Sequence, residues 1–322
     1  MAPETVNNPK VLAFGIVVAD ICCPVIDAIP AAGHLLQVDD IELHCGGCAA
    51  NLAIGLSRLG VDVSLVGKVG KDIFGTAVRQ YLEERGVRTH SVSTADDFVT
   101  SKTVVLTVKG EDRRFIHCFG ANKALSAGDL MSALSDNVAV VYVGGYLAMP
   151  GVDPNETAAA LQTARAGGAI VVLDVVLPHV DPDVEMIRRC LKPVLPETDV
   201  FAPNEEEAAV ITGMKDNPSQ AEALLDMGAR NVILTRGTNG SYFKSRDEEW
   251  EEPPVPIKYV DGAGAGDAFD AGLIFGMLNG LSIKQSMKLA SAYGASACRS
   301  IGCTAGLLDP QEMHRILRES RL

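Results

Sequence analysis

The chain has 322 residues, with 28 Lys and Arg against 41 Asp and Glu, and a formal net charge of −13. This acidic balance argues against nucleic acid or an anionic membrane as a partner, so an anionic ligand would need a local binding site. The length is sufficient for one large α/β domain with a sizeable core.

The N-terminus and the cysteines bear on where the protein works. Residues 1–10 are polar, and the apolar run at 11–18 is too short for a signal sequence or a membrane span, so we expect a cytoplasmic protein. The eight cysteines do not follow the spacing of a secreted disulfide framework. Zinc binding or redox chemistry is conceivable for the group Cys22, Cys23, Cys45 and Cys48. Because no second ligand pair follows at zinc-finger spacing, small buried thiols are the simpler interpretation.

The first half of the chain alternates between apolar runs and helical periodicity. Residues 11–18 predict a buried strand, 49–59 a helix with leucines on one face, 63–67 a strand and 74–85 a helix. This βαβα order predicts parallel pairing.

Two segments interrupt this alternation. Residues 37–44 alternate between apolar and polar side chains, and 102–109 and 114–118 predict two strands joined by a turn at 110–113. These strands predict a small antiparallel sheet, formed from about 21–45 and 97–120, that could cover a ligand as a lid.

After residue 125 the alternation of strands and helices resumes. We expect an antiparallel addition at 241–244 and an acidic, solvated turn at 247–252. The pattern as a whole predicts a single α/β domain over 1–322. The remaining expected strands lie at 139–143, 169–174, near 200 and at 231–235, and the expected helices at 156–166, 183–190, 205–212, 219–227, 268–278, 283–298 and 310–318.

The most informative stretch is the small-residue loop at 261–267, directly before the apolar run at 268–278. The first amides of a helix have no intrahelical partner, so a phosphate could bind the backbone of Gly264, Ala265 and Gly266, with Asp267 beside it. The spacing matches neither a P-loop, which needs Lys after the last glycine, nor the dinucleotide fingerprint, which needs a third glycine at 267. An ordinary glycine-rich turn with an Asp cap remains a structural alternative.

Other polar residues follow predicted strands, where ligands bind in open α/β sheets. Asp20 follows the first strand, and 46–51 opens the helix after the lid strand. Asn204 and Glu207 follow the strand near 200, although this pair would also suit a helix cap. Residues 235–237 follow the strand from 231.

The order and identity of these motifs resemble the PfkB, or ribokinase-like, family of carbohydrate kinases. The matching segments span almost the whole chain: Gly46-Gly47 with Asn51, then 69–75, 204–207 and 261–267. The last is similar to the family's D-[ST]-x-[GA]-[AG]-G-D signature. The resemblance implies a three-layer α/β/α fold with a mostly parallel central sheet and a small antiparallel β lid.

The resemblance also implies an ATP- and Mg²⁺-dependent kinase that phosphorylates a primary hydroxyl of a sugar or sugar-like compound. Asp267 would be the general base, and the amides of Gly264, Ala265 and Gly266 would stabilise the transferring phosphoryl group. We expect the helix start to favour the ionised form of Asp267.

Binding roles follow from the same resemblance. Asp20, Gly46, Gly47 and Asn51 match positions that hold the acceptor's hydroxyls. Asn204, Glu207, Thr235 and Gly237 match the nucleotide side, with Glu207 orienting Mg²⁺ through water. Asp261 and Ala263, with the loop around 300–302, resemble a site for a monovalent cation such as K⁺.

Two departures leave alternatives open. Gly262 stands where the family usually has Thr or Ser, and Cys48 stands where ribokinases carry Lys, so the acceptor need not be ribose. A nucleoside kinase of the same family and a non-catalytic sugar-binding or regulatory member are the alternatives. Because an exposed sheet has edges and an apolar face to cover, we also expect a homodimer formed through the lid.

Overall fold

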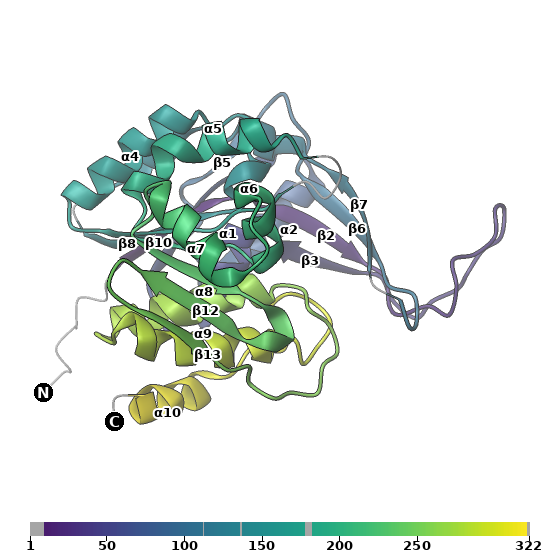
Figure 1. The fold of residues 1–322 in the computed structure, drawn as a ribbon. Coiled ribbons are helices and arrows are strands. Elements are labelled where there is room, and N and C mark those ends of the chain that lie inside the picture. Colours follow the sequence, from purple (N-terminus) through teal and green to yellow (C-terminus); the bar gives the residue numbers. More distant parts are fainter. Residues whose placement is uncertain (1–9, 112, 136, 178–181, 321–322) are drawn as a thin grey trace, which may run out of the picture.

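The computed structural model describes residues 10–111, 113–135, 137–177 and 182–320. Nearly all of the polar N-terminal stretch and residue 112 of the predicted lid turn lie outside the described residues. Figure 1 shows a large sheet between helices, with a smaller sheet projecting from one side. In the part of the chain that the structure describes, no helix is long and apolar enough to cross a membrane.

The larger sheet has nine strands within the described residues, in the order β13-β12-β11-β10-β9-β8-β1-β4-β5. The strands from β11 to β5 pair in parallel, and β12 and β13 add to one edge in antiparallel fashion. The bounds are β1 Lys10–Gly15, β4 Val63–Gly70, β5 Val92–Ala95, β8 Val138–Gly144, β9 Ile170–Leu173, β10 Val200–Phe201, β11 Asn231–Thr235, β12 Ser241–Ser245 and β13 Glu249–Glu252.

Alternation along the central strands builds two hydrophobic cores. In β1, Val11 and Ala13 face one core, while Leu12 and Phe14 face the other. Successive side chains of a strand point to opposite faces, so a fully apolar strand must be covered on both sides. The helices meet this need in two layers (Figure 1).

The first layer packs on the core of Val11 and consists of α1 Cys48–Arg58, α2 Ile73–Glu84, α8 Ala265–Leu278, α9 Ile283–Ala297 and α10 Pro310–Ser320. The second packs on the core of Leu12 and consists of α3 Ala127–Ala133, α4 Pro154–Ala166, α5 Val184–Val194, α6 Glu205–Thr212 and α7 Asn217–Asp226. This confirms the expected three-layer arrangement.

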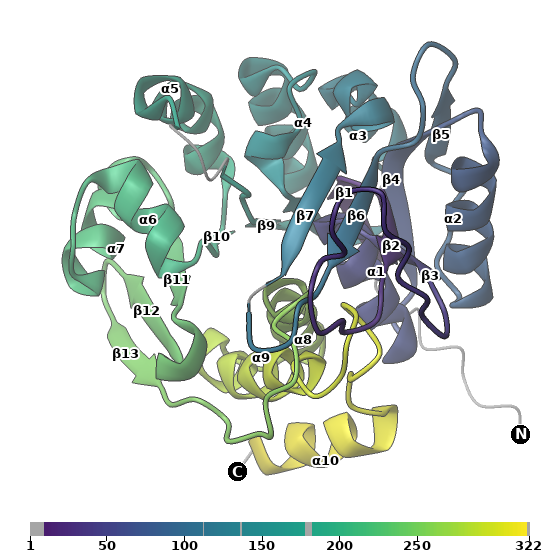
Figure 2. The ribbon, with the colours of Figure 1, turned by 90° about the vertical axis from the view of Figure 1, so that its right-hand side faces the viewer.

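The smaller sheet is the predicted lid, with strands in the order β3-β2-β6-β7. Its strands are β2 Val18–Cys22, β3 Glu42–Gly46, β6 Lys102–Leu106 and β7 Arg114–Cys118. The outer pairings, β2 with β3 and β6 with β7, are antiparallel, whereas the central pair β2 and β6 is parallel. Figure 2 shows these strands in front of the carboxyl ends of the central strands and above the start of α8.

Several details of the sequence-based prediction are wrong. The lid strand expected at 37–44 lies at Glu42–Gly46. The apolar run at 11–18 is not one strand, because β1 ends at Gly15 and β2 begins at Val18, so Asp20 lies within the lid rather than after a central strand. The acidic stretch at 247–252 contains an edge strand, β13, on which Trp250 stacks against Phe243. Helix α8 begins at Ala265, three residues before the predicted start, and this places Asp267 inside its first turn.

Candidate active site

The start of α8 is held by a backbone conformation that requires glycine. Gly264, the N-cap, has φ 71°, and a Cβ there would lie 2.5 Å from the carbonyl oxygen of Cys303. The Ala265 amide makes only a long hydrogen bond of 3.4 Å to the Gly262 carbonyl. Among the described residues, no acceptor is found for the amides of Gly264 and Gly266. These amides are therefore available to an anion.

Asp267 faces away from the helix toward α1. Its Oδ2 accepts a hydrogen bond of 2.8 Å from Nδ2 of Asn51, a buried residue of α1. Burial raises the pKa of Asp267, while the hydrogen bonds from Asn51 and Cys48 lower it by less. The expectation that the helix start favours the ionised form is therefore wrong for the isolated site, because desolvation outweighs it.

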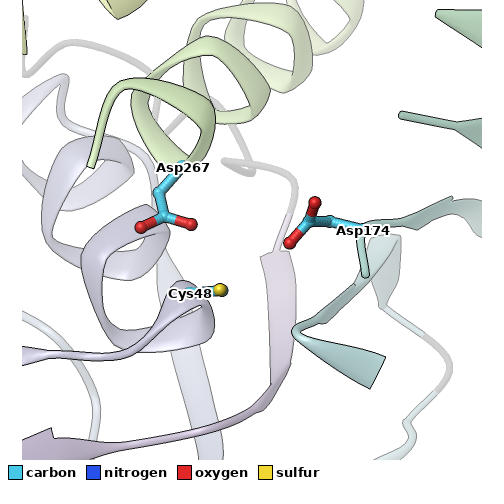
Figure 3. Close-up of side chains that lie close together, drawn as sticks. All are labelled: Cys48, Asp174 and Asp267. Carbon is cyan, nitrogen blue, oxygen red and sulfur yellow. The ribbon is translucent and has the colours of Figure 1, made fainter. Parts of the chain in front are cut away.

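A cavity of about 220 Å³ opens between the start of α8 and the carboxyl ends of the central strands. Figure 3 shows three of its side chains converging from α8, α1 and the end of β9, namely Asp267, Cys48 and Asp174. The full lining is Cys48, Asp174, Val175, Val176, Ala202, Asn204, Glu207, Thr235, Gly262, Gly264, Ala265, Gly266, Asp267 and Asp270.

The cavity carries four carboxyl groups, on Asp174, Glu207, Asp267 and Asp270. No ion pair from Lys or Arg reaches any of them within the described ranges. Burial, followed by repulsion from neighbouring carboxylates, raises the pKa values of Asp174 and Asp270 well above their usual range. Burial raises the pKa of Glu207 to about 7. Because these four carboxyl groups are partly or fully buried close together, their charged forms are disfavoured, and a proton or a bound cation would relieve the repulsion between them.

Two of these carboxylates were missed from the sequence. Asp174 directly follows β9, the position at which ligands bind in such sheets, and its Oδ2 accepts long hydrogen bonds from the Tyr142 hydroxyl and the Gly145 amide. Asp270 lies three residues after Asp267 and thus on the same face of α8. Both positions could have been found by applying the strand-end rule and the helical spacing more strictly.

The residues predicted to border a nucleotide lie on the far side of this cavity. Asn204 and Glu207 form a reciprocal capping box at α6, in which each side chain accepts the other's backbone amide at 2.8 and 3.0 Å. The cap alone explains this residue pair, yet both side chains also line the cavity, as does Thr235. Gly237 lies in a short turn after β11 and is not part of the lining.

The residues predicted to hold the acceptor lie in the lid and at the start of α1. A Cβ on Gly46 would lie 1.9 Å from Oδ2 of Asp20, so this glycine leaves room for that carboxylate, while a Cβ on Gly47 would lie 2.4 Å from the carbonyl oxygen of Ile16. Burial raises the pKa of Asp20 to about 6, with Thr103 opposing and the charge of Asp267 adding to the shift. Asp20 and Asp267 are therefore close enough for the charge of Asp267 to affect the pKa of Asp20.

The other end of the small-residue loop is built differently. Asp261 accepts hydrogen bonds from the amides of Ala263 at 3.1 Å and Gly302 at 3.3 Å. It also forms an ion pair of 2.8 Å with Arg113, from the turn between β6 and β7. Asp261 and Ala263, which were expected to bind a monovalent cation, are hydrogen-bonded to each other. However, Arg113 already supplies a positive charge to the Asp261 carboxylate.

The cysteines stay free thiols. Cys45 is buried, but Cys118 is exposed and the other six are intermediate, so the expectation of small buried thiols holds for only part of the set. In the described part of the chain, the one group with metal-ligand geometry joins Cys48 to Asp174 and Asp267, with ligand atoms within 4.8 Å of one another. Cys22, Cys23 and Cys45 are not part of it.

Comparisons with known proteins show the family. The model of the pfkB family of carbohydrate kinases matches residues 8–310. Ribokinase of Lactococcus lactis is 29% identical over 90% of this chain and 91% of its own length. A 5-dehydro-2-deoxygluconokinase of Clostridium perfringens is 27% identical over 92% of this chain and 91% of its own length.

A solved structure shows the same fold. Ribokinase of Arabidopsis thaliana, complexed with ribose and ATP, superposes with a TM-score of 0.79 over 97% of this chain and 99% of its own, at 24% identity. The cavity and its carboxylates lie on a ribokinase-like fold, and the family model covers most of the sequence. The chain belongs to the pfkB family of carbohydrate kinases and is a kinase.

Proposed function

We propose that this protein transfers the γ-phosphate of ATP to a primary hydroxyl of a sugar or sugar-like compound. The observation that carries the proposal is the shared cavity of Asp267 and the unpaired amides of Gly264 and Gly266. This reaction needs a base that accepts the hydroxyl proton and hydrogen-bond donors that stabilise the transferring phosphoryl group. The first turn of α8 carries both.

Asp267 would accept the proton of the attacking hydroxyl. A general base works best when its pKa lies near the working pH, and burial moves the pKa of Asp267 in that direction. Asn51 fixes the carboxylate through a hydrogen bond to Oδ2, and the Cys48 thiol is a second donor to it. The amides of Gly264, Ala265 and Gly266 would stabilise charge on the phosphoryl oxygens without moving.

The acidic cavity also suits a hard divalent cation. Oxygen ligands and an uncompensated negative charge favour Mg²⁺, and Glu207, beside Asn204, would hold it through water. Bound Mg²⁺ would neutralise phosphate oxygens and lower the pKa values of the surrounding carboxylic acids. Thr235 would border the nucleotide from β11, and Gly237 would contribute only at the outer edge.

The acceptor would bind between the lid and α1. Asp20 reaches this space from β2, and Gly46, Gly47 and Asn51 lie at or near the start of α1. A carboxylate and an amide can hydrogen-bond neighbouring hydroxyls, which is typical of sugar recognition. Cys48 lines the neighbouring cavity, and burial keeps its thiol uncharged. This position therefore provides no positive charge that would bind an anionic group of the acceptor.

We also propose that two copies associate through the lid, along the free edge of β7. Strand β7 is an edge strand with all of its residues exposed, and Phe115 and Ile116 are 58% and 65% exposed. Such an edge needs cover, and a second copy offers the same edge. Sedimentation should give a dimeric mass for the wild type and a monomeric mass for Ile116→Glu; a monomeric wild type would contradict the proposal.

The test of the function is Asp267→Asn, compared with Glu156→Gln, which alters an exposed first-turn carboxylate of α4. We expect kcat to fall by roughly 10²–10⁴ in Asp267→Asn and to be unchanged in the control. ADP release should be measured with Mg²⁺ across panels of sugars and nucleosides. Thermal unfolding should confirm that both variants fold.

The outcomes separate the alternatives. Turnover with nucleosides but not sugars would favour a nucleoside kinase. Sugar binding without ADP formation would favour a non-catalytic member. Full activity in Asp267→Asn would refute the assigned base.

A further inference from the structure

We propose that Arg113, carried by the lid, is the counter-ion of Asp261 and takes the place of a monovalent cation there. The backbone amides of Gly264, Ala265 and Gly266 form the proposed binding site for the phosphoryl group, here called the anion cradle. The lid would then supply the positive charge beside the loop that carries this cradle. The inference rests on the proposed function for its catalytic consequence, but the ion pair itself can be tested without activity.

The geometry leaves little of the Asp261 carboxylate for a metal ion. Arg113 Nη1 lies 2.8 Å from Oδ1, which also accepts the Ala263 amide at 3.1 Å, and Oδ2 accepts the Gly302 amide at 3.3 Å. The side chains of Arg113 and Asp261 are only 20% and 10% exposed. A K⁺ ion at this carboxylate would have to displace a shielded guanidinium that already carries the required charge.

Gly262 lies directly beside this ion pair. A Cβ at this position would lie 3.8 Å from Nη2 of Arg113, an ordinary contact distance, and 3.2 Å from the Tyr259 hydroxyl, which is tight. A Thr or Ser at this position would therefore press on the Tyr259 hydroxyl, whereas the Arg113 guanidinium has room for a Cβ. The guanidinium also lies 5.5 Å from the centre of the Phe115 ring, close enough for a weak cation–π contact from its own lid strand.

The pair connects two parts of the molecule that are distant in sequence. Arg113 precedes β7 in the lid, and Asp261 begins the loop that leads through Ala263 to Gly264, the N-cap of α8. Figure 2 shows the β6–β7 hairpin descending toward the start of α8. Removing one partner of a shielded ion pair leaves the other charge uncompensated, so the loop should shift when the lid contact is lost.

This arrangement makes Arg113 a positioning residue. It does not line the cavity, so it acts through Asp261 on the orientation of the cradle amides. Because a displacement of about 1 Å can cost up to about a hundredfold in rate, the loss should appear mainly in kcat. Opening of the lid would separate the pair, so the cradle would be complete only when the acceptor is covered.

The test compares Arg113→Ala with Arg114→Ala, its neighbour, which pairs with Glu111 at the surface. Thermal unfolding and kcat should be measured in KCl and in choline chloride at equal ionic strength. We expect the wild type and Arg114→Ala to be indifferent to the choice of cation. Arg113→Ala should lose about ten- to a hundredfold in kcat with a smaller change in KM, and its Tm should become higher in KCl than in choline chloride.

Chemical rescue gives a second readout. Guanidinium ion at a few millimolar should restore part of the activity of Arg113→Ala and none to Arg114→Ala. If Arg113→Ala does not fold, Arg113→Gln keeps the side-chain volume and carries the same comparison.

Three results would overturn the inference: a K⁺-specific rise in Tm or kcat in the wild type, equal behaviour of the two arginine variants, or absence of rescue. If the wild type shows no kinase activity, the proposed function fails, and the Tm comparison still decides whether Arg113 replaces a cation.

Discussion

The two ends of the loop at 261–267 carry aspartates in opposite environments. Asp261 has a cation from the lid and two backbone amides, so its charge is fully matched. Asp267 has one amide donor from Asn51 and a thiol, and it shares its cavity with three further carboxyl groups. The difference separates a carboxylate that is paired within the structure from one whose environment suits the proposed role of proton acceptor.

The largest effect should come from the glycine that joins the two ends. Gly264→Ala forces a left-handed backbone, at about 1–2 kcal/mol, and overpacks the Cys303 carbonyl, at about 1–3 kcal/mol, so the free energy of unfolding should fall by roughly 2–5 kcal/mol. The matched control is Gly266→Ala, whose added Cβ meets nothing within 4 Å. Urea unfolding should leave the control unchanged or slightly more stable. Equal stability of the two variants would show that the cradle tolerates a different loop.

A smaller effect should follow from altering the Asp267 end alone. Asn51→Ala removes the hydrogen bond that lowers the pKa of Asp267, so this pKa should rise. The base must be ionised, so the acid limb of the kcat/KM profile should move to higher pH, and the lost hydrogen bond to a charged group should lower kcat/KM at pH 7 by roughly tenfold. The exposed Asn155→Ala provides a control for folding and assay conditions. A profile displaced to lower pH would contradict the assigned contact.

The smallest effect concerns Asp20, a part-buried carboxyl group that, like Asp267, has no lysine or arginine partner within the described residues. Burial raises its pKa to about 6 in the folded protein from an ordinary value of 3.8, so the folded state binds more protons between these two pH values. The stabilisation is present below about pH 4 and is lost as the pH rises through 6. Asp20→Asn should therefore be more stable than the wild type at pH 8, by about 1 kcal/mol after allowance for solvent screening, and should show no advantage at pH 4. Urea titrations at both pH values test this directly; a less stable variant at pH 8 would contradict it.

Local patterns were sufficient where a residue's role depends on its chain neighbours. The apolar runs predicted most of the central strands, leucine spacing predicted α1, and the small residues before the run at 268–278 located the anion cradle. The capping pair Asn204 and Glu207 was also visible, because a cap is a contact over three residues. The break at Gly15 was missed because both halves of the apolar run are buried, one in the central sheet and one in the lid.

The sequence by itself determined the fold family, through short motifs in a fixed order along the chain, and it located the proposed anion cradle and the candidate base Asp267 in one contiguous motif. Only the tertiary structure decided which groups surround that aspartate. Asp174 comes from β9, Asn51 from α1 and Asp20 from the lid, and the raised pKa values exist only because these segments bury one another. The pairing of Arg113 with Asp261 spans almost half the chain, and no local pattern can specify it, because its energy depends on the exclusion of solvent by both partners' surroundings.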